Sequence, residues 1–294
     1  MDNQNTAPAA SPIATSPAPG ITNAPSLENV EGGYVTFIRK RWWAVIIAIV
    51  LAVAVSFVNP FFCIVILVFA ISLVKFLYEN ALFKAFAATN NFSYQKKSEL
   101  LPNKGIIFGI GHSQKYEDVV DGMYKKWPLS LFLYGYTIGY GRDSHRYDRA
   151  VLSINFSTSS PAFVLRRHSV LQILKDEGES LKQNGYSQEV NLEGDFSKHF
   201  NVYIRPNTQD DVLSILTPDK MEVLKALDKY ELELTENGFL YVYCHGYITK
   251  KKNLIDMFSI VEAIIPKIGM DVDRERVIQN IQQDAANTTA PSAS

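Results

Sequence analysis

The sequence predicts an α+β fold: a two-helix transmembrane hairpin followed by a mixed, mostly antiparallel sheet domain with a few helices. One long apolar stretch, residues 42–78, predicts the hairpin. Runs of β-branched and aromatic residues between residues 105 and 165, separated by polar turns, predict the sheet. Strand-like and helical runs then mix without regular βαβ alternation, which favours antiparallel pairing.

Changes in composition divide the 294 residues into four parts. Residues 1–33 are rich in Pro, Ala and Ser and contain no Lys or Arg, so we expect a disordered tail that cannot offset its chain entropy by burial. The tail also lacks the positive start of a signal peptide. Residues 34–80 contain the predicted hairpin, and residues 81–270 a cytoplasmic α+β domain. Residues 271–294 are predicted to hold the end of a C-terminal helix and a second disordered tail.

Two helices fit the apolar stretch better than one. A continuous helix over Trp42–Tyr78 would be about 55 Å long, whereas the hydrocarbon core of a bilayer is about 30 Å thick. Asn59-Pro60 interrupts the helix, because proline removes a backbone donor and restrains the residue before it. The predicted spans are therefore 42–58 and 61–78. The alternatives are a hairpin buried in a soluble core, a kinked single span and a re-entrant loop.

The placement of charge and aromatic residues sets the predicted orientation. Basic residues precede the first span and follow the second, and positive residues stay on the cytoplasmic side. We therefore expect a multi-pass protein of the cell inner (cytoplasmic) membrane with both termini cytoplasmic. The spans contain no ionisable residue at mid-depth, which indicates an anchor and not a transport path. The residues expected at the membrane interface are Arg39, Lys40, Arg41, Trp42, Trp43, Lys75 and Tyr78.

Hydrophobic periodicity predicts the elements of the domain. Strands are expected in GIIFGIG, LSLFLYGYTIGYG, AVLSINF, PAFVLR, SQEVNLEG and FNVYIR. Helices are expected in SVLQILKDEGESLKQ, DDVLSIL and LIDMFSIVEAIIPKI. A short helical continuation, NALFKAFAATNN, follows the predicted hairpin directly.

Two elements carry local signals beyond periodicity. In TPDKMEVLKALDKY, Thr217 suits the N-cap, Pro218 the first helical position and Asp219 the positive end of the helix dipole. In ELELTENGFLYVYCHGYI, Asn237-Gly238 lies between two alternating runs and is a strong hairpin signal. The sequence therefore predicts a capped helix followed by a β-hairpin.

Composition argues against several classes of function. The formal net charge is −1, and nucleic-acid binding requires a clustered basic surface that this chain does not suggest. Two cysteines are too few for a disulfide framework. Cys244 and His245 are neighbours in a strand-like run, so their side chains should point to opposite faces and not form a nucleophile–base pair. The five histidines show no zinc-like spacing, and we expect neither a metal nor a cofactor.

The candidate site lies in two glycine-containing segments, GIIFGIGHSQKYED and TIGYGRDSHRYD. A glycine-rich turn after a strand can cradle phosphate, but the third glycine and the helix of a dinucleotide fingerprint are not evident. Glycines at bulges and tight bends are the more economical explanation. The charged loop of the second segment is either a polar-ligand site or a solvated hairpin loop. The candidate ligand-binding residues are His112, Arg142, Asp143, His145, Arg146 and Asp148, and we expect no catalytic residue.

The stretch NLEGDFSKHFNVY, followed by ILTPDKMEVL, resembles a pattern in uncharacterised bacterial membrane proteins that carry a domain of unknown function. These have a short helical anchor and a cytosolic domain in which a leG-x-F-x-K-x-F-x-V-Y segment precedes an LTP helix start. The resemblance implies a bacterial origin and an inner-membrane location, and implies no activity. Physically, the stretch is a strand, a turn and a capped helix. The matching residues are Leu192, Glu193, Gly194, Phe196, Lys198, Phe200, Val202, Tyr203, Leu216, Thr217 and Pro218.

Two functions from different classes fit these observations. The first is a membrane-anchored, non-enzymatic interaction or scaffold module whose partners are the lipid bilayer and either another protein or a second copy of the chain. The second is a membrane-tethered hydrolase or transferase acting on a polar ligand, which requires His112 and the loop 142–149 to converge on one pocket. A third is an oligomer whose paired hairpins form a passage.

Overall fold

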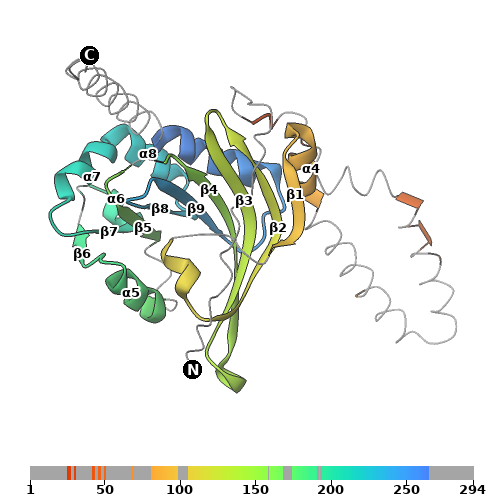
Figure 1. Ribbon diagram of the computed structural model, residues 1–294, viewed down its shortest axis with the longest axis horizontal. Helices are drawn as coiled ribbons and strands as arrows, with labels where there is room; N and C mark the ends of the chain where they lie inside the picture. Colours follow the sequence, from red (N-terminus) through yellow and green to blue (C-terminus); the bar gives the residue numbers. More distant parts are fainter. Residues whose placement is uncertain are drawn as a thin grey trace, which may run out of the picture.

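The structure is a computed structural model that describes residues 25–27, 30, 42–43, 46–47, 50, 68, 81–98, 105–157, 159–167, 174–190, 192 and 194–264. The described strands form one nine-stranded sheet in the order β1-β2-β3-β4-β9-β8-β5-β7-β6, and every strand pair in it is antiparallel (Figure 1). The strands are β1 (Ser93–Ser98), β2 (His112–Tyr124), β3 (Trp127–Ile138), β4 (His145–Asn155), β5 (Phe163–Arg167), β6 (Gln188–Val190), β7 (Phe200–Ile204), β8 (Tyr230–Leu234) and β9 (Phe239–His245).

Short helices connect and cover these strands. They are α4 (Ala81–Asn90), α5 (Leu174–Gln183), α6 (Phe196–His199), α7 (Gln209–Ile215), α8 (Pro218–Ala226) and the 3₁₀ helices η1 (Ile106–Gly109) and η2 (Gly141–Asp143). A further helix covers residues 251–264. The sheet is therefore a central layer with a helical cover on each face.

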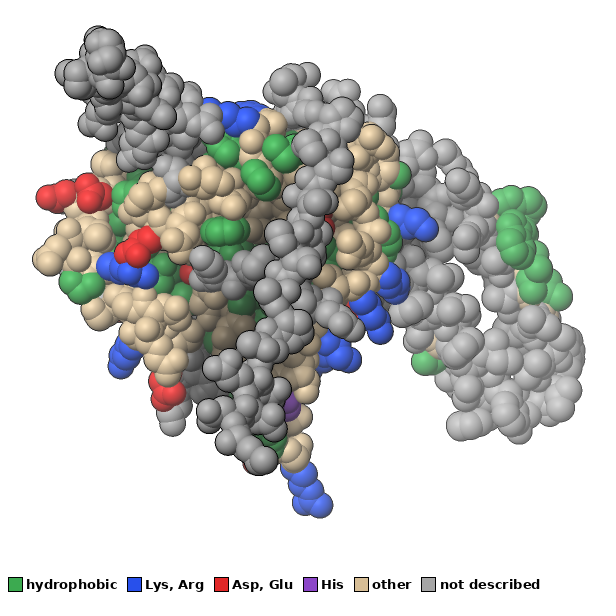
Figure 2. Space-filling model, in the orientation of Figure 1, with side chains coloured by type: hydrophobic (Ala, Val, Ile, Leu, Met, Phe, Trp, Pro, Cys, Tyr) green, Lys and Arg blue, Asp and Glu red, His purple; other side chains and the backbone are tan. Residues whose placement is uncertain are grey.

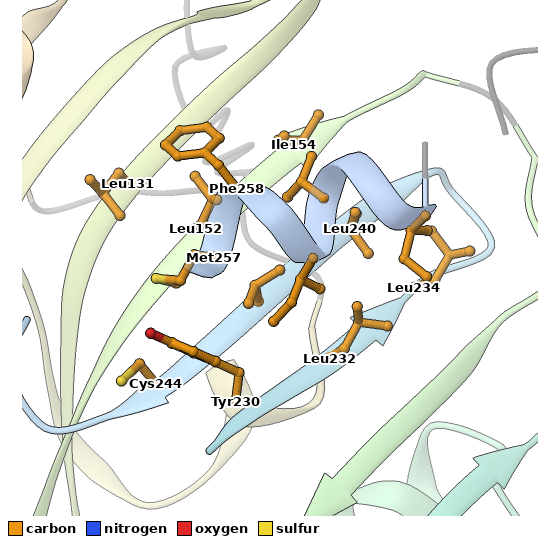
Figure 3. Close-up of a cluster of buried hydrophobic side chains, with 14 of the residues drawn as sticks. Leu131, Leu152, Ile154, Tyr230, Leu232, Leu234, Leu240, Cys244, Met257 and Phe258 are labelled. Carbon is orange, nitrogen blue, oxygen red and sulfur yellow. The ribbon is translucent and has the colours of Figure 1, made fainter. Parts of the chain in front are cut away.

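One face of the sheet carries the larger hydrophobic core. Successive strand residues alternate between faces, and on this face leucine, isoleucine and valine side chains pack against α4 and the helix 251–264. Figure 3 shows Met257 and Phe258 of that helix over Leu131 and Leu152 of β3 and β4. Burying such side chains stabilises the fold by about 1.5–3 kcal/mol each.

The opposite face is aromatic and is covered by η1 and α5. Phe108 of η1 lies among Phe132, Tyr134 and Tyr241, with ring centroids 5.0 Å apart for Phe108 and Tyr134. Leu181 of α5 belongs to the same cluster. This face also contains the buried charges described below.

The strands β2, β3 and β4, of 13, 12 and 11 residues, extend beyond the rest of the sheet. At about 3.3 Å per residue each is about 35–45 Å long. The β3–β4 hairpin consequently projects from the body of the domain to the lower edge of Figure 1. Two register shifts in the β2–β3 pairing, at 112–115 and 117–120, bend β2 so that it follows the hairpin.

The helix α4 precedes β1 in the chain and packs against the larger core. Its apolar face buries Leu82, Phe83 and Phe86, and Asn91 ends the helix with a positive φ of 55°. The amide of Asn90 bonds the backbone of Ser26 twice, accepting from its N–H at 2.6 Å and donating to its C=O at 3.1 Å. Part of the segment predicted to be a disordered tail thus lies against α4.

The two local signals in the sequence are confirmed. The helix α8 begins with Pro218 at its first position, although the Thr217 hydroxyl bonds the Asp219 carboxylate at 2.5 Å and makes no side-chain bond to a backbone N–H. Strands β8 and β9 form the predicted hairpin around Asn237-Gly238. GIIFGIG was predicted as a strand, but Ile106–Gly109 form η1 instead, with the Ile106 N–H donating to the Glu233 carboxylate of β8 and not to a neighbouring strand.

The predicted fold class needs correction on two counts. The sheet is antiparallel and not mixed. In the part of the chain that the structure describes, no helix is long and apolar enough to cross a membrane. A span needs about 20 consecutive apolar residues, and the helices described from α4 onward are shorter than that. The transmembrane hairpin, the membrane assignment and the multi-pass inner-membrane location with both termini cytoplasmic are therefore not supported.

Most of the predicted hairpin lies outside the described residues. Within the spans 42–58 and 61–78, the structure describes Trp42, Trp43, Ile46, Ile47, Val50 and Val68 as helical and exposed. Of the predicted interface residues, Trp42 and Trp43 are 60% and 57% exposed. Arg39, Lys40, Arg41, Lys75 and Tyr78 lie outside the described residues.

Truncation of Phe86 tests the packing of α4 on the sheet. Phe86 is fully buried and contacts Phe92 and Phe258 at centroid distances of 5.7 and 5.8 Å. We expect Phe86→Ala to lower the free energy of unfolding by about 3–5 kcal/mol, measured by urea denaturation of the full chain. The control Val223→Ala, at an exposed site on α8, should change it by less than about 0.5 kcal/mol. Equal effects of the two variants would contradict this packing.

Candidate functional site

The candidate residues predicted from sequence all lie at the projecting end of the β3–β4 hairpin. We call this end, His112 of β2 together with residues 138–148, the finger tip. Strand pairing brings His112 opposite Thr137, and Ile138 opposite His145, so the two glycine-containing segments become neighbours. The remaining candidate residues are Arg142, Asp143, Arg146 and Asp148.

His112 holds an aromatic ring at the finger tip. Its ring stacks on Tyr140 with centroids 4.6 Å apart and planes 13° apart. Its Nε2–H donates to the Gly139 carbonyl at 2.8 Å, which places its Nδ1 beside the Ser113 hydroxyl at 3.0 Å. Tyr140 is 80% exposed. The fold therefore orients this tyrosine without burying it.

Two glycines shape the projecting part of the β3–β4 hairpin, which we call the finger. Gly139 has a φ of 79°, and a Cβ there would lie 2.3 Å from the Asp143 carbonyl, so only glycine fits this turn. Gly135 faces Asp148 across the strands, and a Cβ there would meet the Arg146 guanidinium at 2.2 Å. Because Gly135 has no side chain, the Arg146–Asp148 ion pair lies over its Cα, with Arg146 Nη2 2.9 Å from Asp148 Oδ1.

Stacked tyrosines support the finger below its tip. Tyr136 and Tyr147 are directly cross-strand and stack at 5.5 Å, and Tyr134 continues the stack at 5.4 Å from Tyr136. Cross-strand aromatic pairs contribute roughly 0.2–1 kcal/mol each. The hairpin is therefore stiffened along its length, which favours a fixed orientation of the tip.

The finger tip is a convex surface. Arg142, Asp143, His145 and Arg146 are exposed, and Figure 2 shows Lys or Arg and His side chains at the lower end of the molecule. Two clefts of the described residues lie elsewhere, one beside residues 155–162 and the other beside α8 and the helix 251–264. The candidate residues thus converge, but on a projection that can be contacted from several sides.

A buried charge cluster in the sheet was not predicted from the sequence. Glu231 of β8 accepts hydrogen bonds from Nη1 of Arg149 at 2.6 Å and of Arg166 at 2.5 Å, and all three side chains are almost fully buried. His245 Nε2 lies 3.6 Å from the other oxygen of Glu231. Burial alone would raise the pKa of Glu231, but Arg166, Arg149 and His245 hold this pKa well below its usual range.

A second buried carboxyl, Glu233, fixes η1. It accepts hydrogen bonds from the Ile106 N–H at 3.0 Å and the Tyr243 hydroxyl at 2.6 Å. Burial raises the pKa of Glu233 to about 7, although these hydrogen bonds and the charge of Arg166 act in the other direction. Burial and the nearby Glu233 also raise the pKa of Tyr243. Glu233 therefore replaces the missing backbone partner at the start of η1.

The sequence held only weak signals for these features. Glu231 and Glu233 alternate with leucines in YELEL, a pattern that normally predicts a solvated face. Here η1 and α5 cover that face. Tyr140 stands between glycines in a polar loop, and its exposed position depends on His112, which is 28 residues away in the chain.

Neither metal binding nor a nucleophile–base pair of Cys244 and His245 has the necessary geometry among the described residues. Among the described residues, no group of three or more His, Cys, Asp or Glu side chains could hold a metal ion. Cys244 is buried in the larger core, whereas His245 lies on the other face beside Glu231, so the predicted separation of these side chains is confirmed. Arg149, Arg166 and Glu231 are buried structural charges and do not reach the finger tip.

Comparisons with known proteins give little. No family model matches the chain, and no curated protein matches it. Among solved structures, the chain is similar to the mycobacterial trehalose monomycolate transport factor A, TtfA, with 12% identity over 63% of this chain and 91% of that chain and a TM-score of 0.40. At this score the likeness carries no argument about function or partners. The bacterial family pattern remains an expectation.

Neutralising Glu231 should destabilise the sheet. Glu231→Gln removes the buried charge that compensates two arginines, and breaking such a pair costs about 3–5 kcal/mol. Because the pKa of Glu231 is lowered in the fold, its contribution is present above the unfolded pKa and is lost as the pH falls through the folded pKa. We expect the loss in urea denaturation at pH 7. A decrease in the free energy of unfolding below about 1 kcal/mol would show that the charge of Glu231 does not stabilise the cluster.

Neutralising Glu233, two residues from Glu231, should change the pH dependence of the free energy of unfolding in the opposite direction. The pKa of Glu233 is raised in the folded protein. Its contribution to the free energy of unfolding is therefore present below the pKa of the unfolded chain and is lost as the pH rises through about 7. We expect the wild-type free energy of unfolding to fall by about 2–3 kcal/mol more than that of Glu233→Gln between pH 5 and pH 8. Parallel pH profiles for the two proteins would contradict the assignment.

Proposed function

We propose that this protein is a non-enzymatic interaction module that contacts a partner protein through the finger tip. The observation that carries the proposal is Tyr140, which is 80% exposed yet held by His112 at the end of a stiff hairpin. A ring so exposed adds little to folding, so its orientation serves contact with something outside the domain. Tyrosine and arginine are the residues that dominate binding energy in protein interfaces.

The chemistry around Tyr140 fits a protein surface. Arg142 and Arg146 add cationic groups, while Asp143 and Asp148 add carboxylates, so the tip offers both signs of charge around one aromatic anchor. Preorganisation by His112 reduces the entropy lost when the ring is immobilised in a complex. The partner is another protein, and a second copy of this chain is one outcome of the test below.

The alternative, a hydrolase or transferase acting on a polar ligand, has less support. His112 and residues 142–148 lie together, although that hypothesis requires His112 and the loop 142–149 to converge on one pocket. However, an enzyme encloses its substrate to exclude water and fix the reacting geometry. The finger tip is convex, and His112 uses Nε2 to hold Gly139.

Site-specific cross-linking in cells of the source organism tests the proposal. A photoreactive amino acid replaces exposed Ser144 at the finger tip and leaves Tyr140 intact. We expect a discrete protein adduct that falls by about 30-fold when Tyr140→Ala is added, the effect of losing an interface anchor worth about 2 kcal/mol. His112→Ala should weaken the adduct less, because the tyrosine remains but is no longer held.

The same photoreactive residue at exposed Val223 of α8 is the matched control and should not give this adduct. An adduct of twice the mass of the chain would identify a second copy as the partner. The proposal is wrong if no adduct forms at position 144, or if the adduct persists unchanged with Tyr140→Ala while the variants remain folded.

A further inference from the structure

A polar cleft lies at the far end of β4 from the finger tip. It has a volume of about 830 Å³ and forms where the β4–β5 connection, the β8–β9 turn and the start of α7 meet. Small-molecule sites are typically about 300–1,000 Å³. Because β4 has 11 residues, the cleft is about 35 Å from the finger tip and independent of it.

The cleft contains a buried hydroxyl that lacks a hydrogen-bond partner. Ser160 is 7% exposed, lines the cleft, and its Oγ bonds no described group. Its backbone N–H donates to the Glu236 carbonyl at 3.2 Å, which fixes the residue against the β8–β9 turn. A buried hydroxyl without a partner costs about 1–3 kcal/mol. This oxygen is itself buried, so a ligand hydroxyl in the cleft would remove the cost after the Ser160 side chain rotates toward it.

The charges around the cleft exclude an anionic ligand. Among the described residues that line it there is no Lys or Arg, and the lining includes the carboxylates of Asp211 and Glu236. Glu236 is compensated from outside the lining by Arg205, at 2.5 Å. A phosphate or carboxylate would meet these acceptors, and the neighbouring cation, Arg205, is already paired with Glu236.

The remaining lining suits a neutral ligand rich in hydroxyl groups. The hydroxyls of Ser157 and Thr208 already donate to Asn155 Oδ1 and to the Arg205 carbonyl, so they can accept from a ligand. Ser159 supplies a further hydroxyl, and the carboxylates accept from ligand hydroxyls. Phe239 is partly exposed, and its ring stacks at 5.8 Å on Tyr241, which fixes it at the edge of the cleft. An aromatic ring among polar groups offers a surface for the C–H faces of a sugar ring.

We infer that this cleft binds a neutral, polyhydroxylated ligand of the carbohydrate class. Asp211 and Glu236 accept from ligand hydroxyls, Phe239 packs against the ring, and Ser160 is the deepest contact once its side chain rotates toward the cleft. The site makes the protein a receptor for a small saccharide in addition to its proposed contact with a protein partner.

Saturation-transfer NMR with the full chain tests this inference. The probes are glucose, maltose, cellobiose and N,N′-diacetylchitobiose, with glucose 6-phosphate as the anionic counterpart. We expect at least one neutral sugar to bind and the phosphorylated sugar to bind at least about tenfold more weakly. Ser160→Ala should weaken binding about tenfold, the effect of one lost hydrogen bond. Asp211→Asn, at an exposed site on α7, should weaken it similarly without affecting folding.

Ser153→Ala is the matched control, because Ser153 is a buried serine of β4 outside the cleft lining. Binding to this variant should stay within about twofold of wild type. The inference is overturned if none of the four neutral sugars binds, if the phosphorylated sugar binds as well as they do, or if binding survives both Ser160→Ala and Asp211→Asn.

Discussion

The shared carboxylate of Glu231 ties the two halves of the sheet together. In the order β4-β9-β8-β5, Arg166 reaches it from the neighbouring strand and Arg149 reaches it across β9. One half of the sheet is the meander β1–β4 that carries the finger, and the other is β5, β7 and β6. The finger projects from a rigid base because β4, which forms one side of it, is fixed to β8 through this ion pair and to β9 through backbone pairing.

The sequence predicted elements whose signal is local. Asn237-Gly238 and Thr217-Pro218 act within a few residues, and the structure has the hairpin and the helix there. GIIFGIG has a strand-like pattern, but Glu233, 127 residues away, bonds the backbone at Ile106 in η1. The strand β2 was missed because HSQKYEDVVDGMY is polar and its alternation is broken by bulges. Hydropathy alone predicted a membrane hairpin that the described helices do not support.

The candidate site was predictable in part. The two glycine-containing segments, 105–118 and 137–148, are separated in the chain, and only antiparallel pairing of β2 with β3 and of β3 with β4 makes them neighbours. Sequence reasoning therefore found residues that converge but could not tell a projection from a pocket. Tyr140 escaped notice because its importance comes from exposure and stacking. Glu231, Arg149 and Arg166 were missed because nothing local in YELEL shows that α5 and η1 cover that face.

Hydrogen exchange along the finger tests most directly the claim that the fold presents a preformed contact surface. The account predicts that backbone amides of β3 and β4 which bond across the finger, up to Ile138 and His145, exchange slowly, within about tenfold of those in the β4–β9 pair. Slow exchange would mean that Tyr140 is held in place before any partner arrives. Exchange at the rate of an unstructured loop would contradict the account, because the tip would then have no fixed orientation to present.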